Sequence, residues 1–141
     1  MGNRLKIGII GAGGISCSHI EAYRKHPDVE LYAFCDINAD RLRYMGERYG
    51  VTRLYTDMNA LLALPELDAV SVCTWNNGHA PCTIAALNAG KHVLCEKPMA
   101  ATEADARKML EARDKSGKLL TVGYQYRHFP VNQVAKRTID D

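Results

Sequence analysis

The apolar residues of the chain gather in five short runs, and mixed apolar and charged stretches separate them. Within each run the apolar positions are nearly continuous rather than alternating, which is typical of strands buried on both faces of a parallel sheet. The runs are Leu5–Ile10, Val29–Cys35, Ala69–Cys73, Val93–Cys95 and Leu119–Val122. This pattern predicts a short buried strand at each of these places.

The stretches between the runs carry helical signals. Leu42, Met45 and Tyr49 are three and four residues apart, so they share one face of a helix. A further helix is predicted over 102–117, because it starts at a capping threonine and ends at a glycine. The last stretch, 131–141, also has the pattern of a helix. Strands that alternate with helices predict an α/β fold with a doubly wound parallel sheet.

Composition narrows the class of protein. The chain has 141 residues, 47% apolar and 24% charged, with a formal net charge of +2. We expect a single domain over 1–141, with a core of its own. No block of Lys and Arg stands out, so we expect no nucleic-acid partner. No apolar run approaches the roughly 20 residues that span a bilayer, so we expect no membrane partner.

The cysteines point to a reducing compartment. Their number is odd, none has C-x-x-C spacing, and three lie in the apolar runs. We therefore expect reduced, buried thiols in a cytoplasmic protein, and no metal site. The residues are Cys17, Cys35, Cys73, Cys82 and Cys95.

The first run leads directly into a glycine-rich turn, GAGGIS. Gly11 permits a tight turn, and Gly13 lets a diphosphate approach the backbone without a Cβ in the way. Gly14 and Ile15 begin the next helix, whose free N–H groups and positive dipole end would face that diphosphate. Ser16 replaces the third glycine of the usual G-x-G-x-x-G pattern and is small enough for close packing. The turn therefore predicts a dinucleotide-binding site.

An acid follows the second run. Asp36 lies 23 residues beyond Gly13, where a carboxylate can accept hydrogen bonds from both ribose hydroxyls of an adenosine. Because a carboxylate repels a 2′-phosphate, Asp36 favours NAD over NADP, although Arg41 lies near enough in sequence to reach a phosphate. The alternative is that Asp36 is a helix N-cap or a turn residue. Strand, glycine turn, helix and acid together predict a Rossmann-type fold with three αβα layers.

A second group of polar residues follows Cys73. Ligands of open α/β sheets bind outside the carboxyl ends of the strands, so Thr74 and Asn76 are candidates to contact a cofactor. Trp75, the only tryptophan, either belongs to the core or lies flat against a cofactor ring or sugar. His79 either caps or packs at the start of a helix or binds a ligand directly. The sequence leaves both alternatives open.

Five segments together resemble the glucose-fructose oxidoreductase / inositol dehydrogenase / MocA family, over essentially the whole chain. Glu-Lys-Pro after Gly-Lys-His-Val is the most specific of them, whereas the glycine turn alone is common. The segments are GxGGI at 11–15, the aspartate at 36, TxNxxH at 74–79, AGKHVxxEKP at 89–98 and VGYxxR at 122–127. One departure is Trp75, where the family usually has proline, which affects how the turn is held and how the nicotinamide ribose is contacted.

The resemblance implies a catalytic role for Lys97. In the family this lysine hydrogen-bonds a substrate hydroxyl beside the nicotinamide, and the following proline, here Pro98, fixes the turn, commonly through a cis peptide. A residue before proline is pushed away from helical geometry, which suits a preorganised group. Glu96 either orients Lys97 or contacts the cofactor, and Lys97 is itself a candidate contact of the cofactor. The alternative is that Lys97 is a solvated surface residue in a turn.

By the same resemblance, the segment after the last run faces the nicotinamide and the substrate. Tyr124, Gln125 and Arg127 are the residues it would present there, with Tyr124 and Arg127 as substrate-side candidates. The alternative is an exit linker with ordinary polar residues.

Members of the family continue into a second, sheet-rich domain that covers the substrate and supplies a histidine for proton transfer. The resemblance implies that this domain is absent from 1–141, which stops where the domain should start. His128 lies in the exit segment and lacks the context of that histidine. We expect the NAD-binding part of a dehydrogenase that acts on a sugar or cyclic polyol, inactive without the second domain. The alternative is a free-standing dinucleotide-binding module, a sensor or partner subunit without turnover. In either case we expect self-association through apolar surface that the second domain would cover.

Overall fold

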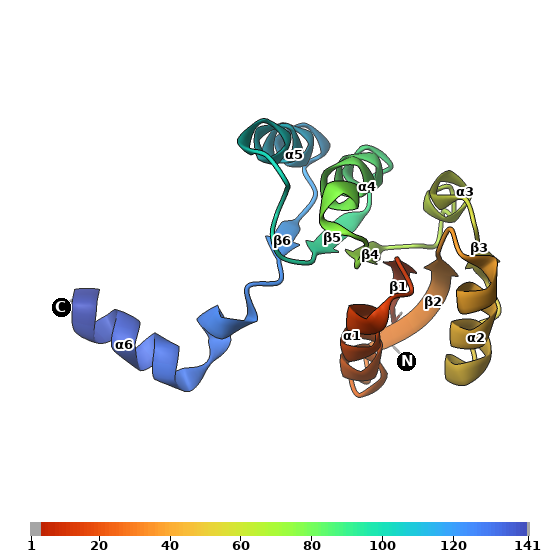
Figure 1. Ribbon diagram of the computed structural model, residues 1–141, viewed down its shortest axis with the longest axis horizontal. Helices are drawn as coiled ribbons and strands as arrows, with labels where there is room; N and C mark the ends of the chain where they lie inside the picture. Colours follow the sequence, from red (N-terminus) through yellow and green to blue (C-terminus); the bar gives the residue numbers. More distant parts are fainter. Residues whose placement is uncertain (1–3, 141) are drawn as a thin grey trace.

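The computed structural model describes residues 4–140. Strands and helices alternate along it, as the apolar runs predict (Figure 1). The strands are β1 (Leu5–Ile10), β2 (Val29–Cys35), β3 (Leu54–Tyr55), β4 (Ala69–Val72), β5 (His92–Cys95) and β6 (Leu120–Val122). The helices are α1 (Gly14–Arg24), α2 (Ala39–Tyr49), α3 (Met58–Leu62), α4 (Asn76–Asn88), α5 (Glu103–Ser116) and α6 (Pro130–Asp140), with a 3₁₀ turn, η1 (Gln125–His128).

All six strands belong to one parallel sheet with the order β3-β2-β1-β4-β5-β6. The chain winds outward from β1 to β3, crosses back to place β4 beside β1, and then winds outward to β6. The strand order therefore reverses between β1 and β4, and a crevice for a ligand lies at such a point. The predicted doubly wound α/β fold is confirmed.

Helices cover both faces of the sheet in three layers. In Figure 1, α1 and α2 lie on one face and α3, α4 and α5 on the other. Each face has its own apolar core. The first is built around Ile20, Phe34 and Leu42, and the second around Leu87 and Met109, all of them buried. Burial of both faces is why the strands read as continuous apolar runs.

The helix signals are confirmed in detail. Leu42 and Met45 are buried, and Tyr49 packs against the same cluster. Thr102 caps α5, because its Oγ1 accepts the N–H of Asp105 at 3.1 Å. Strand ends differ from the prediction by a single residue at β4, β5 and β6. β3 was not among the predicted runs, because two residues are too few to show a period.

The end of the described chain stands apart from the sheet. α6 projects away from the three layers and packs mainly against η1 (Figure 1). It covers most of the helix predicted over 131–141, and Asp141 lies outside the described residues. Across 4–140 no helix has the length and apolar character to cross a bilayer. The same residues hold no group of His, Cys, Asp and Glu arranged for a metal ion.

Candidate functional site

The glycine turn passes directly over the end of β4. Gly11 has a φ of +94°, and a Cβ on it would lie 2.7 Å from the carbonyl carbon and oxygen of Cys73. Both the left-handed backbone and the close approach exclude a side chain at this position. The turn is also tied to β2, because the N–H of Gly11 donates to the carbonyl of Cys35 at 2.8 Å.

Beyond Gly11 the turn opens into a cradle. A Cβ on Gly13 or on Gly14 would meet nothing within 4 Å, so the backbone at the start of α1 faces open space. Gly13 is the N-cap of α1 and offers no side chain to bond the first-turn N–H groups. Ser16 is buried beneath the turn, and its hydroxyl donates to the carbonyl of Gly13 at 2.6 Å. Unshielded N–H groups at a helix N-terminus form a site for an anion such as a diphosphate.

The cradle opens into a hollow of about 490 Å³ between the glycine turn and α2. The sequence prediction identified its glycine rim and Arg41 on its other wall, but not Tyr44 and Arg48, which α2 also brings there. The lining residues are Ala12, Gly13, Gly14, Cys17, Asn38, Asp40, Arg41, Tyr44, Met45 and Arg48. An elongated ligand held at the glycine turn therefore has room to continue toward α2.

Asp36 turns its carboxylate toward the glycine turn. Oδ2 accepts the N–H of Ala12 at 2.6 Å, and Oδ1 accepts the N–H of Asn38 at 2.8 Å. The second bond makes Asp36 a turn residue, as the alternative interpretation holds, but the N-cap of α2 is Asn38. Each carboxylate oxygen has two lone pairs, so these bonds leave acceptor capacity for ligand hydroxyls.

The turn after β4 is exposed at its tip and anchored at its base. Trp75 is 88% exposed, so the interpretation of this tryptophan as a core residue is wrong. Its φ of −67° is one that proline also adopts. Thr74 and Asn76 flank it, and Asn76 begins α4.

His79 lies beneath this turn and is only 1% exposed. Its Nδ1 is 2.6 Å from the carbonyl oxygen of Pro98, and its Nε2 is 3.1 Å from that of Thr74. Both nitrogens are thus committed to backbone carbonyls, so the ring has no free polar atom for a ligand. This geometry agrees with a packing role at the start of α4.

Glu96, Lys97 and Pro98 follow β5 at the same edge of the sheet. The Lys97–Pro98 peptide is cis. Glu96 is buried, its Oε1 lies 2.8 Å from Nε2 of His19, and its Oε2 accepts the N–H of Lys97 at 3.1 Å. Lys97 itself is exposed, and its Nζ forms no hydrogen bond or ion pair with the rest of 4–140. Its ammonium is therefore available to a ligand.

The sequence prediction missed the polar network that holds Glu96. His19 and Tyr23 come from α1, and Ser71 comes from β4. The only signal in the sequence was that His19 and Tyr23 are four residues apart and therefore share one face of a helix, close to Ile20. This spacing does not identify their partners.

Three thiols lie at the carboxyl ends of the strands beneath the site. Burial raises the pKa of Cys35 and of Cys73 to about 12, and the pKa of Cys95 to about 11. All five cysteines are free. Thiols with raised pKa values are poor nucleophiles, so these three serve as small buried side chains.

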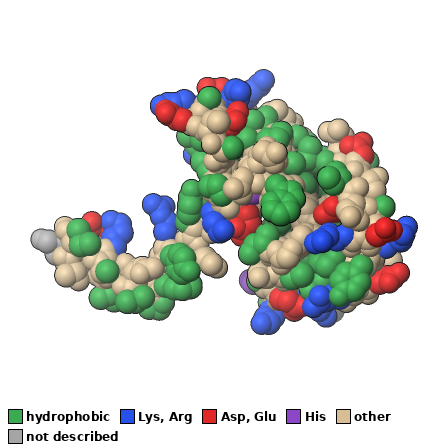
Figure 2. All heavy atoms as spheres, viewed as in Figure 1, with side chains coloured by type: hydrophobic (Ala, Val, Ile, Leu, Met, Phe, Trp, Pro, Cys, Tyr) green, Lys and Arg blue, Asp and Glu red, His purple; other side chains and the backbone are tan. Residues whose placement is uncertain are grey.

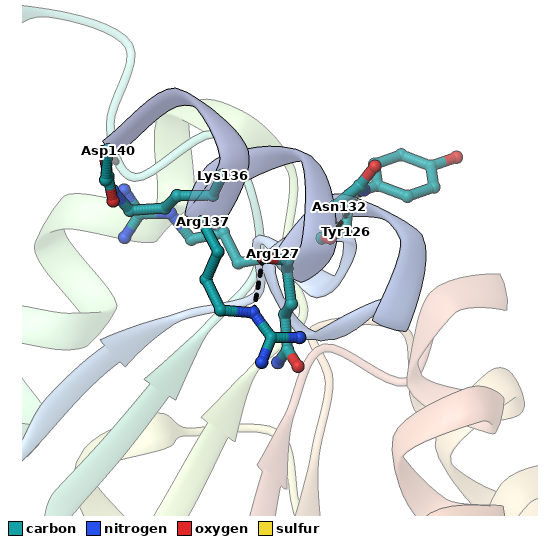
Figure 3. Close-up of a pocket in the computed structure, with 7 residues that line it drawn as sticks. Tyr126, Arg127, Asn132, Lys136, Arg137 and Asp140 are labelled. Carbon is teal, nitrogen blue, oxygen red and sulfur yellow. Dashed lines mark hydrogen bonds and ion pairs between the residues drawn. The ribbon is translucent and has the colours of Figure 1, made fainter.

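The segment after β6 begins beside Glu96, because a Cβ on Gly123 would lie 3.2 Å from Oε1 of Glu96, and it then turns away toward α6. Tyr124 is 46% exposed, and Gln125 begins η1. Arg127 faces a second hollow of about 750 Å³, between η1 and α6, and does not line the hollow beside the glycine turn (Figure 3). The second hollow is lined by Tyr126, Arg127, Asn132, Gln133, Lys136, Arg137 and Asp140.

Comparison with known proteins gives a consistent result. The sequence profile of a family described as "Oxidoreductase family, NAD-binding Rossmann fold" matches residues 5–124. A myo-inositol 2-dehydrogenase of Thermotoga maritima is 41% identical over 123 residues, which are 87% of this chain and 37% of the relative. The chain thus spans about 37% of the length of this relative.

Solved structures superpose closely. The WlbA dehydrogenase of Bordetella pertussis, in complex with NADH and UDP-GlcNAcA, has a TM-score of 0.92 and 32% identity over 98% of this chain and 42% of its own. The 3-ketoreductase KijD10 of Actinomadura kijaniata, in complex with TDP-benzene and NADP, has a TM-score of 0.88 and 29% identity over 98% of this chain and 44% of its own. These two relatives bind different nicotinamide dinucleotides.

Proposed function

Because the chain belongs to the glucose-fructose oxidoreductase / inositol dehydrogenase / MocA family of oxidoreductases, we propose that it binds NAD for a dehydrogenase of sugar or cyclic polyol hydroxyls. The observation that carries this proposal is the open cradle at Gly13 and Gly14, which adjoins a hollow large enough for an elongated ligand. In this proposal the N–H groups at the start of α1 hold the diphosphate.

NAD is preferred to NADP in this proposal. Asp36 presents a carboxylate beside the glycine turn, where it would accept ribose hydroxyls and repel a 2′-phosphate. Arg41 and Arg48 line the neighbouring hollow and would favour NADP if they turned toward that phosphate. The direct position of Asp36 at the turn is the reason for choosing NAD.

Lys97 is the proposed catalytic residue, and it is also a proposed contact of the bound cofactor beside the nicotinamide. A bound nicotinamide would supply the hydride acceptor. The exposed ammonium of Lys97 would donate a hydrogen bond to the substrate hydroxyl and stabilise negative charge that develops on its oxygen. Trp75 would lie against the nicotinamide half of the cofactor, with Thr74, Asn76 and Glu96 forming the edge of the same crevice.

The substrate side and the second domain are proposed on the family resemblance. Tyr124 and Arg127 are the proposed substrate-side residues, although Arg127 faces the hollow beside α6 in this structure. The relatives are longer than this chain, and we propose that a second domain covers the substrate and supplies the proton acceptor. We expect a cytoplasmic location, which the free thiols support.

One observation favours binding without turnover by this chain. His19 and His79 are the histidines nearest to Lys97 along the hydrogen-bond network, and both are committed to protein partners. Neither is free to accept a proton from a substrate hydroxyl at Lys97. A module that binds a dinucleotide for a partner domain or subunit is therefore the second candidate function.

The sole tryptophan makes the proposal testable in solution. Since Trp75 is the only tryptophan, the tryptophan emission of the protein reports on this turn alone. NAD should quench that emission, and NADH should also accept energy from it. Gly13→Val fills the cradle at a position with room for a side chain, so it should fold and lose binding. Ser18→Val, on the exposed surface of α1, is the matched control. Equal NADH affinity in native protein and Gly13→Val would contradict the proposal.

A self-associated state is also proposed. Phe129, Val131, Val134 and Ile139 are exposed along η1 and α6, and Figure 2 shows hydrophobic side chains gathered there. Large exposed apolar surface favours association with a second apolar surface. We propose that a second copy of the chain covers it.

A further inference from the structure

We propose that His19 and His79 are positioning residues that hold the backbone on either side of Lys97. The proposal rests on the role of Lys97 given above. Each residue adjacent to Lys97 is bonded by one of the two histidines, whereas Lys97 keeps a free side chain.

His79 holds the residue after Lys97. Its Nδ1 lies 2.6 Å from the carbonyl oxygen of Pro98, and its Nε2 lies 3.1 Å from the carbonyl oxygen of Thr74. One buried ring thus joins the turn after β4 to the turn after β5. Since carbonyl oxygens only accept hydrogen bonds, the pair of bonds is complete only when both ring nitrogens carry a proton.

His19 holds the residue before Lys97. Its Nε2 lies 2.8 Å from Oε1 of Glu96, and the two side chains are only 10% and 11% exposed. The carboxylate accepts from the ring, and its other oxygen accepts the N–H of Lys97 at 3.1 Å. The histidine therefore fixes the carboxylate that in turn fixes the amide of Lys97.

The orientation of His19 is itself determined by two more side chains. Its Nδ1 lies 3.3 Å from Oγ of Ser71, and the hydroxyl of Tyr23 lies 2.6 Å from the same Oγ. If Nε2 donates to Glu96, a neutral ring accepts from Ser71 at Nδ1, and Ser71 accepts from Tyr23. Each hydrogen in this series has one acceptor, so the ring is held in one orientation.

The two histidines act from opposite faces of the sheet. His19 belongs to α1 and His79 to α4, and these helices cover different faces (Figure 1). The Glu96–Lys97–Pro98 turn is therefore held from both sides at the carboxyl edge. Such support places a flexible side chain for its task, because the backbone from which it departs cannot shift.

The first test needs no cofactor. Hydrogen exchange of the Lys97 amide would be followed by NMR in His19→Leu, His19→Gln and His79→Gln. Exchange should become at least about tenfold faster in His19→Leu and His79→Gln. His19→Gln should stay close to native, because its amide can donate to Glu96 and accept from Ser71. Glutamine is not such a substitute at position 79, because its amide oxygen would face one of the two carbonyl oxygens that the ring contacts. Should His79→Gln not fold, the two His19 variants carry the test.

The matched control is His92→Gln. His92 lies at the opposite end of β5, where its Nδ1 accepts the N–H of Leu119 at 3.1 Å. This variant removes a comparable hydrogen bond and should leave the Lys97 amide unchanged. Native exchange of that amide in His19→Leu and His79→Gln, or equal acceleration in His92→Gln, would overturn the proposal whether or not the protein binds NADH.

The second test separates positioning from structural support. NADH affinity would be measured for each histidine variant with Lys97 intact and with Lys97→Met. Positioning predicts about tenfold weaker binding with Lys97 intact and less than about a twofold change with Lys97→Met. Equal losses in both backgrounds would show that the histidines support the fold only, and would overturn the proposal. Native protein that fails to bind NADH would refute the proposed function, and the exchange test would still decide the inference.

Discussion

The backbone N–H of Ala12 donates to Oδ2 of Asp36 at 2.6 Å. The glycine turn after β1 is therefore joined to the end of β2 by a hydrogen bond to a charged group. The same carboxylate that would select the adenosine ribose also fixes the shape of the turn that would hold the diphosphate.

Asp36→Ala should weaken NADH binding by about tenfold to a hundredfold, the range expected for lost hydrogen bonds to a charged group. It should weaken NADPH binding much less, because the repulsion between the carboxylate and the 2′-phosphate is lost as well. Isothermal titration calorimetry with both dinucleotides measures the ratio of NADH affinity to NADPH affinity. An unchanged preference for NADH would contradict the role assigned to Asp36.

Gly11→Ala should lower the free energy of unfolding by at least about 2 kcal/mol, since Gly11 has a φ of +94° and a Cβ there would meet the backbone of Cys73. Urea denaturation of the variant against native protein measures the loss. Gly13→Ala is the matched control and should be close to native in stability, because its Cβ points into open space. Similar losses in the two variants would show that the close approach to β4 does not constrain the turn.

Three buried thiols predict how stability depends on pH. Burial raises the pKa of Cys35, Cys73 and Cys95 to between about 11 and 12, whereas unfolded cysteines titrate near 9. The unfolded state releases protons above pH 9 before the folded state does, so this contribution to stability is full below pH 9. It is lost as the pH rises from 9 to 12.

The free energy of unfolding, measured with urea, should be lower at pH 10.5 than at pH 8. In Cys73→Ala the difference between the two pH values should be smaller. Alkylation offers an independent check, because the same thiols should resist iodoacetamide in native protein at pH 8 and react once the protein is unfolded. Rapid labelling of Cys73 in native protein would be inconsistent with its burial.

The apolar side chains of α6 predict self-association at concentrations of tens of micromolar. Val134→Asp places a charge between the exposed side chains of Val131 and Ile139. It should shift the protein to monomer without changing the fold. Light scattering measures the molecular mass of the native protein and of the Val134→Asp variant in solution. Lys108→Gln, on the exposed surface of α5, lowers the net charge by the same single unit and is the matched control. Native protein that is monomeric at these concentrations would refute this expectation.

The parts of the structure that sequence predicted are those set by local constraints. Strands such as β4 are buried on both faces, so their residues are continuously apolar, and Gly11 is required by the backbone of its own turn. Thr102 caps α5 with a partner three residues away. Patterns of this kind lie within one short window of the chain.

The parts that sequence did not predict depend on distant partners. His19 and Glu96 are 77 positions apart, and nothing near His19 indicates that it meets an acid. Trp75 was ambiguous because an apolar residue in a turn can be buried or exposed, and only the fold decides that it is exposed. Arg127 follows β6 as expected, but the direction of η1 takes it toward α6.

The most direct test of the central claim is a crystal structure of this chain grown with saturating NADH. The account predicts diphosphate density against the N–H groups of Gly13, Gly14 and Ile15, with ribose hydroxyls at Asp36 and the nicotinamide toward Lys97. Density for NADH at any other place on the molecule, with the cradle at Gly13 filled by solvent, would contradict it.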